Sequence, residues 1–337
     1  MFVTSEADRA GIFVAVISGG RPALKDRPTH KFLAQLKEHG FTNIAWIVAE
    51  HHADEYERDE HEIVAYPSQW AADYAAEHWM HTDPVPGAGG FHGAFPGREW
   101  ACLEAERRGC WAVLQLDDNI ISLSMVMLRG GGGKIVEDHG GLASHADFLA
   151  GFMKSTNGWM VGANLSSIPE PEKRVIRTGF CYSLFLERVG EGREHWYGPF
   201  EDDITHAFQY GTRADGAAPL LVPLINYTKE SKSSSGMRKH YNHKRAVQLQ
   251  RIFPESARIG VRRTTSNGLG DARVFHSMSP TAIRNPLVVK DKALYNQTVK
   301  RLNALLEVWA ERSLEHNRAK IAGRIEKIKT KGGGDKQ

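Results

Sequence analysis

The sequence predicts an α/β fold with a mostly parallel central sheet, and three observations support this. Short apolar runs are typical of buried strands, and segments of helical periodicity lie between them. Polar residues follow two of the strands directly. The apolar runs of the first half are 12–17, 44–48, 62–66 and 111–116. The helical segments are 29–39, 68–80 and 99–108. Strands that alternate with helices favour parallel pairing, and ligands of such sheets bind beyond the carboxyl ends of the strands.

Each element of the first half follows from its residues. Ile12-Phe-Val-Ala-Val-Ile17 is apolar throughout, as a strand buried on both faces requires. Gly40 is placed to end the first helix. The segment 83–97 is rich in Gly and Pro and predicts a loop, so we expect the next helix to begin at Glu99.

The second half is less regular, and it suggests how the chain is organised. We expect a loop at 129–134, helices at 148–156 and 200–210, and strands at 159–163, 180–186 and 220–225. A long basic amphipathic helix is predicted for Lys292–Ile328, with Leu302, Leu305, Leu306 and Trp309 on one stripe. The organisation predicted is a main domain over 10–245, a basic, partly helical extension over 246–330, and a disordered tail over 331–337.

Charge and cysteine content restrict the function further. The net charge of the 337 residues is +3, but residues 229–263 carry ten Lys or Arg against Glu230 and Glu255. Such a basic run predicts either a polyanion partner or a solvated surface. Cys102, Cys110 and Cys181 are odd in number and form no CxxC, which fits reduced thiols in a cytoplasmic protein. Neither a signal peptide nor a membrane-spanning segment is expected.

The most informative motif is Asp117-Asp118-Asn119, which directly follows the apolar strand 111–116. Carboxylates at the end of a buried strand are costly unless they are paired. A hard divalent cation is a natural partner because it takes oxygen ligands. The alternative is a plain turn, since Asp and Asn favour turns.

Two further features could hold a nucleotide. Ser18, Gly19, Gly20 and Arg21 follow the first strand, where glycines let backbone amides approach a phosphate and Arg21 could add a charged contact; the alternative is a simple turn. Arg98 could contact a diphosphate or a sugar. We nevertheless expect its side chain to be solvated at a helix start.

A second acidic cluster, Glu201-Asp202-Asp203, stands at the start of the predicted helix 200–210. Acids there suit the helix dipole, which is one interpretation. The other is a general base that takes a proton from an attacking hydroxyl group. We assign that role to Asp202, with Asp203 as the rival.

The Ser-rich basic segment 227–245 could bind a polyanion. Its cations could contact a nucleic-acid backbone or a diphosphate, and Tyr241 could stack on a base. The residues predicted to contact nucleic acid are Lys232, Arg238, Lys239, Tyr241, Lys244 and Arg245. His240 or His243 could complete a metal site, and His276 is a third candidate.

These motifs, in this order, resemble those of GT-A-type glycosyltransferases, which have a DxD-like metal motif at a strand end and an acidic motif at a helix start. Within that class the chain is similar to the TET/JBP-associated glycosyltransferases, which include the base J and phage DNA-modifying enzymes. The narrower resemblance is based on Ile17–Pro22, Leu116–Asn119 and Phe200–Asp203. It departs at Asn119, where the pattern has Asp.

The resemblance implies a GT-A-like nucleotide-binding fold. It also implies a metal-dependent, inverting transfer of a sugar, which is expected to be glucose. The donor would be a UDP-sugar, and the acceptor the hydroxyl of 5-hydroxymethylcytosine or a related pyrimidine in DNA. It further implies Mn²⁺ or Mg²⁺ on Asp117, Asn119 and a histidine, with Asp118 near the nucleotide. No membrane or obligate protein partner is implied.

Two other classes of function remain open from the sequence. A nucleotidyltransferase also combines a nucleotide, a metal ion and paired carboxylates. A non-catalytic DNA-binding protein would use the basic segment, but it leaves both acidic clusters without a role.

Overall fold

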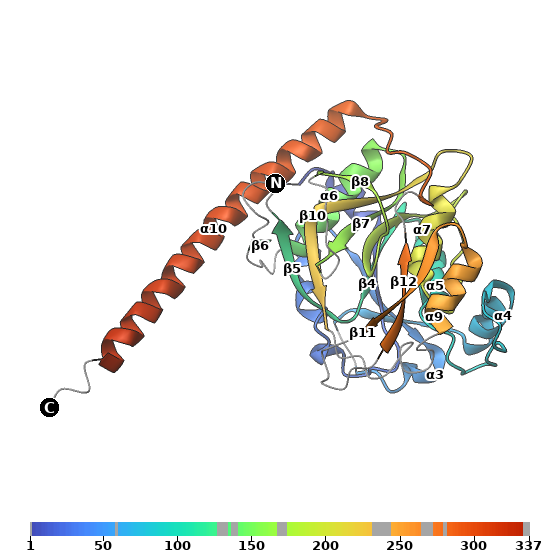
Figure 1. Ribbon diagram of the computed structural model, residues 1–337. Coiled ribbons are helices and arrows are strands. Elements are labelled where there is room, and N and C mark those ends of the chain that lie inside the picture. The colour runs from blue at the N-terminus through green and yellow to red at the C-terminus, as the bar shows by residue number, and fades with distance from the viewer. Residues whose placement is uncertain are drawn as a thin grey trace.

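The predicted α/β class is confirmed by the computed structural model (Figure 1). It describes residues 2–57, 60–126, 134–135, 141–166, 174–230, 244–263, 272–278 and 282–332. Within these ranges a ten-stranded mixed sheet forms the centre, and a separate two-stranded hairpin lies beside it.

The order of the sheet is β3-β2-β1-β4-β9-β7-β10-β5-β6, with β8 paired to β10. Within the ten-stranded sheet, β9, β5 and β8 run against the direction that its other described strands share. The bounds are β1 (Ile12–Ile17), β2 (Asn43–Ala49), β3 (Glu62–Tyr66), β4 (Ala112–Asp117), β5 (Ile120–Val126), β6 (Lys134–Ile135), β7 (Gly158–Leu165), β8 (Arg177–Thr178), β9 (Leu184–Arg188) and β10 (Ala218–Lys229). The hairpin consists of β11 (Ala257–Arg263) and β12 (Ala272–Met278).

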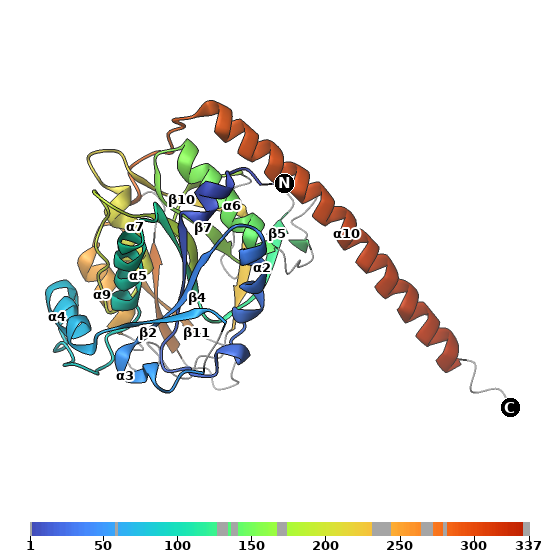
Figure 2. The same cartoon turned by 180° about the vertical axis from the view of Figure 1, so that it is seen from behind.

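Helices cover both faces of the sheet (Figure 2). Side chains of α2, α6 and α10 join one buried cluster, and side chains of α4, α5, α7 and α9 join the other. Successive residues of β1 alternate between the two clusters, so this strand is buried on both faces as its apolar run predicts. The helices are α1 (Glu6–Ala10), η1 (Leu24–Asp26), η2 (His30–Phe32), α2 (Ala34–Glu38), α3 (Glu50–Ala53), α4 (Ser68–His78), α5 (Phe95–Arg107), α6 (Gly141–Ser155), α7 (Asp202–Gly211), α9 (Lys244–Ile252) and α10 (Lys292–Gly332).

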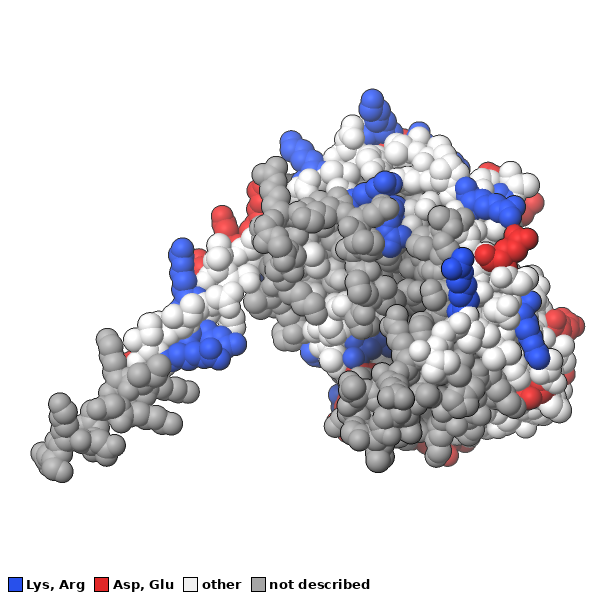
Figure 3. Space-filling model, viewed as in Figure 1, with Lys and Arg blue, Asp and Glu red and all other residues white. Residues whose placement is uncertain are grey.

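The long C-terminal helix is confirmed as α10, which extends well beyond the body (Figures 1 and 2). Leu302 and Trp309 are buried against the body, whereas Leu314, Ile321 and Ile325 are exposed. Both basic and acidic side chains are seen on the described part of the projecting helix (Figure 3). Among the described residues, no helix is long and apolar enough to cross a membrane.

Some boundaries differ from the sequence prediction. Helix α5 begins at Phe95 rather than Glu99, because Pro96 occupies its first turn, where proline needs no backbone donor. Helix α6 begins at Gly141 rather than 148, and the sequence did not indicate β5. The three cysteines are buried and unpaired, in agreement with the expectation of reduced thiols.

Candidate active site

The site lies where the parallel strands β1 and β4 end side by side. Ile17 is paired with Asp117 in the sheet register, so the residues that follow each strand meet at one edge. Ser18 Oγ donates a hydrogen bond to Asp118 Oδ2 (3.0 Å) across this edge. The predicted nucleotide loop and the predicted metal motif are therefore in direct contact.

Asp118 is the buried anchor of the loop after β1. It forms ion pairs with Arg21 and with Arg27, whose Nε lies 3.4 Å from Oδ2. Tyr56 reinforces the loop, since its hydroxyl group hydrogen-bonds Ser18 Oγ (3.1 Å) and accepts from the Arg21 amide (3.3 Å). Burial raises the pKa of Asp118 although both arginines oppose the rise. Asp118 thus fixes the conformation of the loop that follows β1.

Asp117 holds two cations, one on each carboxylate oxygen. Arg98 Nη2 lies 2.9 Å from Oδ1, and Lys229 Nζ lies 2.5 Å from Oδ2. Lys229 also donates to Ser183 Oγ (2.6 Å). Burial alone would raise the pKa of Asp117, but the charges of Lys229 and Arg98 hold it well below its usual range. Asp117 is therefore ionised at neutral pH.

Arg98 is buried, which corrects the expectation that it is solvated. Its side chain is 4% exposed, and its Nε donates to Asp202 Oδ2 (3.0 Å) while Nη2 reaches Asp117. The guanidinium carbon lies 5.5 Å from the ring centre of Phe185 and 5.3 Å from that of Trp196. The physical reason is the early start of α5, which places Arg98 in the first helical turn, facing the acids at the sheet edge. Arg98 thus joins the two acidic clusters.

A buried polar network supports Arg98 from behind. Arg98 Nη1 donates to Gln115 Oε1 (3.4 Å), and Gln115 Nε2 donates to Glu187 Oε2 (3.3 Å). Glu187 also accepts from the Tyr210 hydroxyl (2.9 Å) and lies 2.5 Å from His206 Nε2. Because these residues come from α5, β4, β9 and α7, the network fixes how those elements meet at the site.

The second acidic cluster has a different electrostatic character. Asp202 is the first residue of α7 and pairs with Arg98, whereas Asp203 Oδ1 accepts from the Ile204 amide (2.9 Å). Burial, reinforced by the negative charges of Asp202 and Glu201, raises the pKa of Asp203 to about 8. A carboxyl group that titrates near neutrality is suited to proton transfer.

The chain segment that leads into this cluster, residues 198–201, packs tightly against the start of α5. Glu201 adopts a left-handed conformation (φ 50°, ψ 37°), and the Gly198–Pro199 peptide bond is cis. A Cβ atom on Gly198 would lie 2.1 Å from Phe95 Cδ1, so no side chain fits there. The chain therefore enters α7 directly against the start of α5, which carries Arg98.

Several contributors to the site were not predicted. No sequence pattern marks Arg27 or Ser183, and Lys229 lies in the basic run predicted to bind a polyanion. Gln115 could have been found, because it is a polar residue inside the apolar strand 111–116. A buried polar side chain in such a strand needs a partner.

Part of the predicted site lies outside the described residues. These positions are Lys232, Arg238, Lys239, His240, Tyr241 and His243. Lys244 and Arg245 begin α9, and His276 lies in β12, but of these three only the backbone is described. Gly19 and Gly20 lie beside Ser18, and Gly20 has a positive φ of 61°, as a tight turn requires.

Asp117 and Asn119 fit the role of metal ligands that the motif predicts. Asn119 Oδ1 is buried without a hydrogen-bond partner, so it is free to accept a ligand, and the Asp117 carboxylate two residues earlier is ionised. Oxygen donors of this kind suit Mg²⁺ or Mn²⁺. Because Arg98 contacts Asp117 Oδ1 and Lys229 contacts Oδ2, a metal ion on Asp117 would compete with both side chains.

Comparison of the chain with protein-family models and with curated proteins gives no match.

Proposed function

We propose that the protein is a glycosyltransferase that moves a sugar from a UDP-sugar to the hydroxyl group of 5-hydroxymethylcytosine in DNA. The sugar that we expect is glucose. The observation that carries the proposal is Arg98, which bonds Asp117 of the strand-end motif and Asp202 of the helix-start motif. Two acidic motifs that are 85 residues apart thus belong to one constellation at the carboxyl edge of the sheet.

The fold supports a GT-A-type arrangement. Strands β3, β2, β1 and β4 are parallel neighbours, and the Asp117–Asn119 motif ends the last of them. The antiparallel β9 then separates this half of the sheet from β7 and β10. We therefore assign the nucleotide to the edge near Ser18–Arg21 and the acceptor to the side near α7.

The donor site combines an anchored loop with several cations. Ser18 and Arg21, held by Asp118, would contact the nucleotide, and Arg98 and Lys229 supply positive charge next to the diphosphate position. A bound Mn²⁺ or Mg²⁺ on Asp117 and Asn119 would neutralise the UDP leaving group.

Asp203 is the better candidate for the general base. Asp202 is committed to the ion pair with Arg98, whereas the pKa of Asp203 is raised to about 8. Asp203 would take the proton of the hydroxymethyl group as its oxygen attacks the anomeric carbon. The bond from that carbon to the diphosphate oxygen breaks, and its electron pair leaves with UDP. Attack opposite the leaving group inverts the anomeric centre.

Mass spectrometry of modified DNA tests the proposal. The chain is incubated with Mn²⁺, a panel of sugar nucleotides and DNA that carries 5-hydroxymethylcytosine. We expect the mass of one hexosyl group on each modified base, with none on unmodified DNA and none with Asp117→Ala. Absence of transfer from every sugar nucleotide, with labelled NTP incorporated instead, would identify a nucleotidyltransferase and overturn the proposal.

A further inference from the structure

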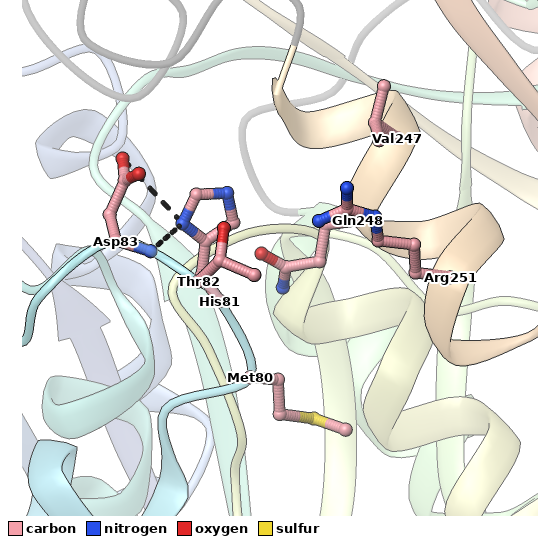
Figure 4. A pocket seen from close by; sticks show the side chains of 7 residues that line it. All are labelled: Met80, His81, Thr82, Asp83, Val247, Gln248 and Arg251. Carbon is pink, nitrogen blue, oxygen red and sulfur yellow. Dashed lines mark hydrogen bonds and ion pairs between the residues drawn. The ribbon is translucent and has the colours of Figure 1, made fainter.

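A cavity of about 270 Å³ lies between α9 and the segment that follows α4 (Figure 4). Val247, Gln248 and Arg251 line it from α9, and residues 80–83 line it from the other side. This volume is just below the usual range for small-ligand sites, so it suits a single ring rather than a whole nucleotide sugar.

Met80 and His81, which line the cavity, contact the segment that leads into the second acidic cluster. The Met80 amide donates to the Gly198 carbonyl oxygen (2.7 Å). The ring of His81 meets that of Phe200 edge to face, with centroids 4.9 Å apart. Since Phe200 directly precedes Glu201, a ring held in the cavity would lie beside the start of α7.

Gln248 gives the cavity its chemical character. The residue is 4% exposed, and its Oε1 has no hydrogen-bond partner. In Figure 4 its carboxamide faces residues 81 and 82 across the cavity. A buried, unpaired acceptor is costly in a folded protein and calls for a ligand that donates to it. A carboxamide presents an acceptor and a donor side by side, which matches the paired polar edge of a nucleobase.

We propose that this cavity receives the acceptor cytosine after it has been flipped out of the duplex. The 4-amino group of the base donates to Gln248 Oε1, and N3 accepts from Gln248 Nε2. The imidazole of His81 and the thioether of Met80 offer flat and polarisable surface to the ring, and Arg251 is placed for the flanking phosphate. The identity of the base rests on the proposed function, whereas the pocket itself rests on the cavity and on Gln248.

Two measurements on Gln248→Leu test the proposal. The first is titration of duplex DNA that carries the fluorescent base 2-aminopurine next to the target cytosine, because its emission rises when the neighbouring base leaves the stack. The second is the KM for the acceptor DNA in the transfer assay. We expect Gln248→Leu to abolish the fluorescence rise and to increase the acceptor KM about tenfold or more, since a paired edge contact discriminates by this much. The affinity for UDP-sugar should not change.

Thermal unfolding separates a binding role from a structural one. Replacing an acceptor that the folded protein leaves unpaired should keep Tm unchanged or raise it. Gln35→Leu is the matched control, because Gln35 Oε1 is also buried without a partner but lies on α2, against the other face of the sheet. We expect Gln35→Leu to leave both DNA measurements at their wild-type values.

The outcomes are distinguishable from failure of the proposed function. A fluorescence rise that depends on Gln248, without any sugar transfer, would support the pocket and overturn the proposed function. Normal fluorescence and a normal acceptor KM in Gln248→Leu would overturn the pocket. Weakened UDP-sugar affinity with normal DNA binding would assign the cavity to the donor and would also overturn it.

Discussion

Asp117 and Asp203 belong to the two acidic clusters that meet at Arg98, and their carboxyl groups are shifted in opposite directions. Asp117 contacts two cations, which keep its pKa below the usual range. Asp203 stands beside Asp202 and Glu201, and burial together with these charges raises its pKa to about 8. One residue type thus has a lowered pKa at one point and a raised pKa at another, and the proposed function assigns an electrostatic role to the first and proton transfer to the second.

The largest expected effect comes from removing the cation that the two clusters share. Arg98→Met leaves the carboxylates of Asp117 and Asp202 without their common partner in a buried site. Breaking such a pair costs about 3–5 kcal/mol of unfolding free energy. Denaturant unfolding measures this. Arg107→Met is the matched control on the same helix, because its side chain is 70% exposed and its solvent-screened pair with Glu104 should contribute little to stability. Equal losses in the two variants would contradict the structural role of Arg98.

The next largest effect separates Asp203 from Asp202. We expect Asp203→Asn to lower kcat about 10²–10⁴-fold, because a general base acts in the transition state, with little change in UDP-sugar affinity. Asp202→Asn should also slow transfer, but it weakens the pair with Arg98 and should therefore lower Tm as well. Turnover, calorimetric titration of the donor and thermal unfolding are measured on both variants. If Asp203→Asn keeps a normal kcat and Asp202→Asn loses it, Asp202 rather than Asp203 is the general base.

The pH dependence of stability gives a smaller effect with a defined sign. The folded pKa of Asp203, about 8, lies above its unfolded value near 3.9, so the folded state binds the extra proton between these limits. The contribution of Asp203 to stability is fully present below pH of about 4 and is lost as pH rises towards 8. Asp117 has the opposite sign, since its lowered pKa confines its loss of stability to acid pH.

Thermal unfolding from pH 4 to 9 measures this dependence on the wild type and on Asp203→Asn. The advantage of Asp203→Asn should grow as pH rises and level off above the folded pKa. In parallel, wild-type kcat/KM should rise with pH around a midpoint of about 8, and the variant should lose that rise. Parallel stability curves for the two proteins would show that Asp203 titrates normally.

We expect the smallest effect on the candidate site from substitutions in the basic segment 227–245. Replacing Arg238, Lys239, Lys244 and Arg245 by Ala should weaken DNA binding and flatten its dependence on salt. The slope of log affinity against log salt should fall by about 0.9 for each phosphate that the variant no longer neutralises. UDP-sugar affinity should stay unchanged. Loss of donor affinity with intact DNA binding would show that these cations serve the diphosphate, as Lys229 is placed to do.

Local sequence patterns predicted the elements that are mainly apolar or begin at a recognisable signal. Strands β1, β2 and β4 are largely apolar and buried, β3 is a short run after Glu62, and helix α7 begins at a run of acids, so each could be located within a few residues. Strand β5 was missed because Ile120–Val126 follows the acidic turn directly, and its pairing partner is β10, about 100 residues later in the chain.

The sequence pattern locates the two acidic motifs but not the side chains that join them. Both acidic motifs lie at the predicted strand and helix ends, yet no local pattern shows that Arg98 is buried between them. Its partners Asp117 and Asp202 are 19 and 104 positions away, and the fold alone brings them together. For the same reason Lys229 belonged to a basic run in the sequence and pairs with Asp117 in the structure.

The most direct test of a single active site is a double-mutant cycle on sugar transfer between Asp117→Asn and Asp203→Asn. If the two clusters act as one unit through Arg98, either substitution alone removes most of the rate, and the double variant is no slower than the slower single variant. Rate reductions that multiply in the double variant, or full transfer in either single variant, would contradict the account, because the two acids would then act independently or not at all.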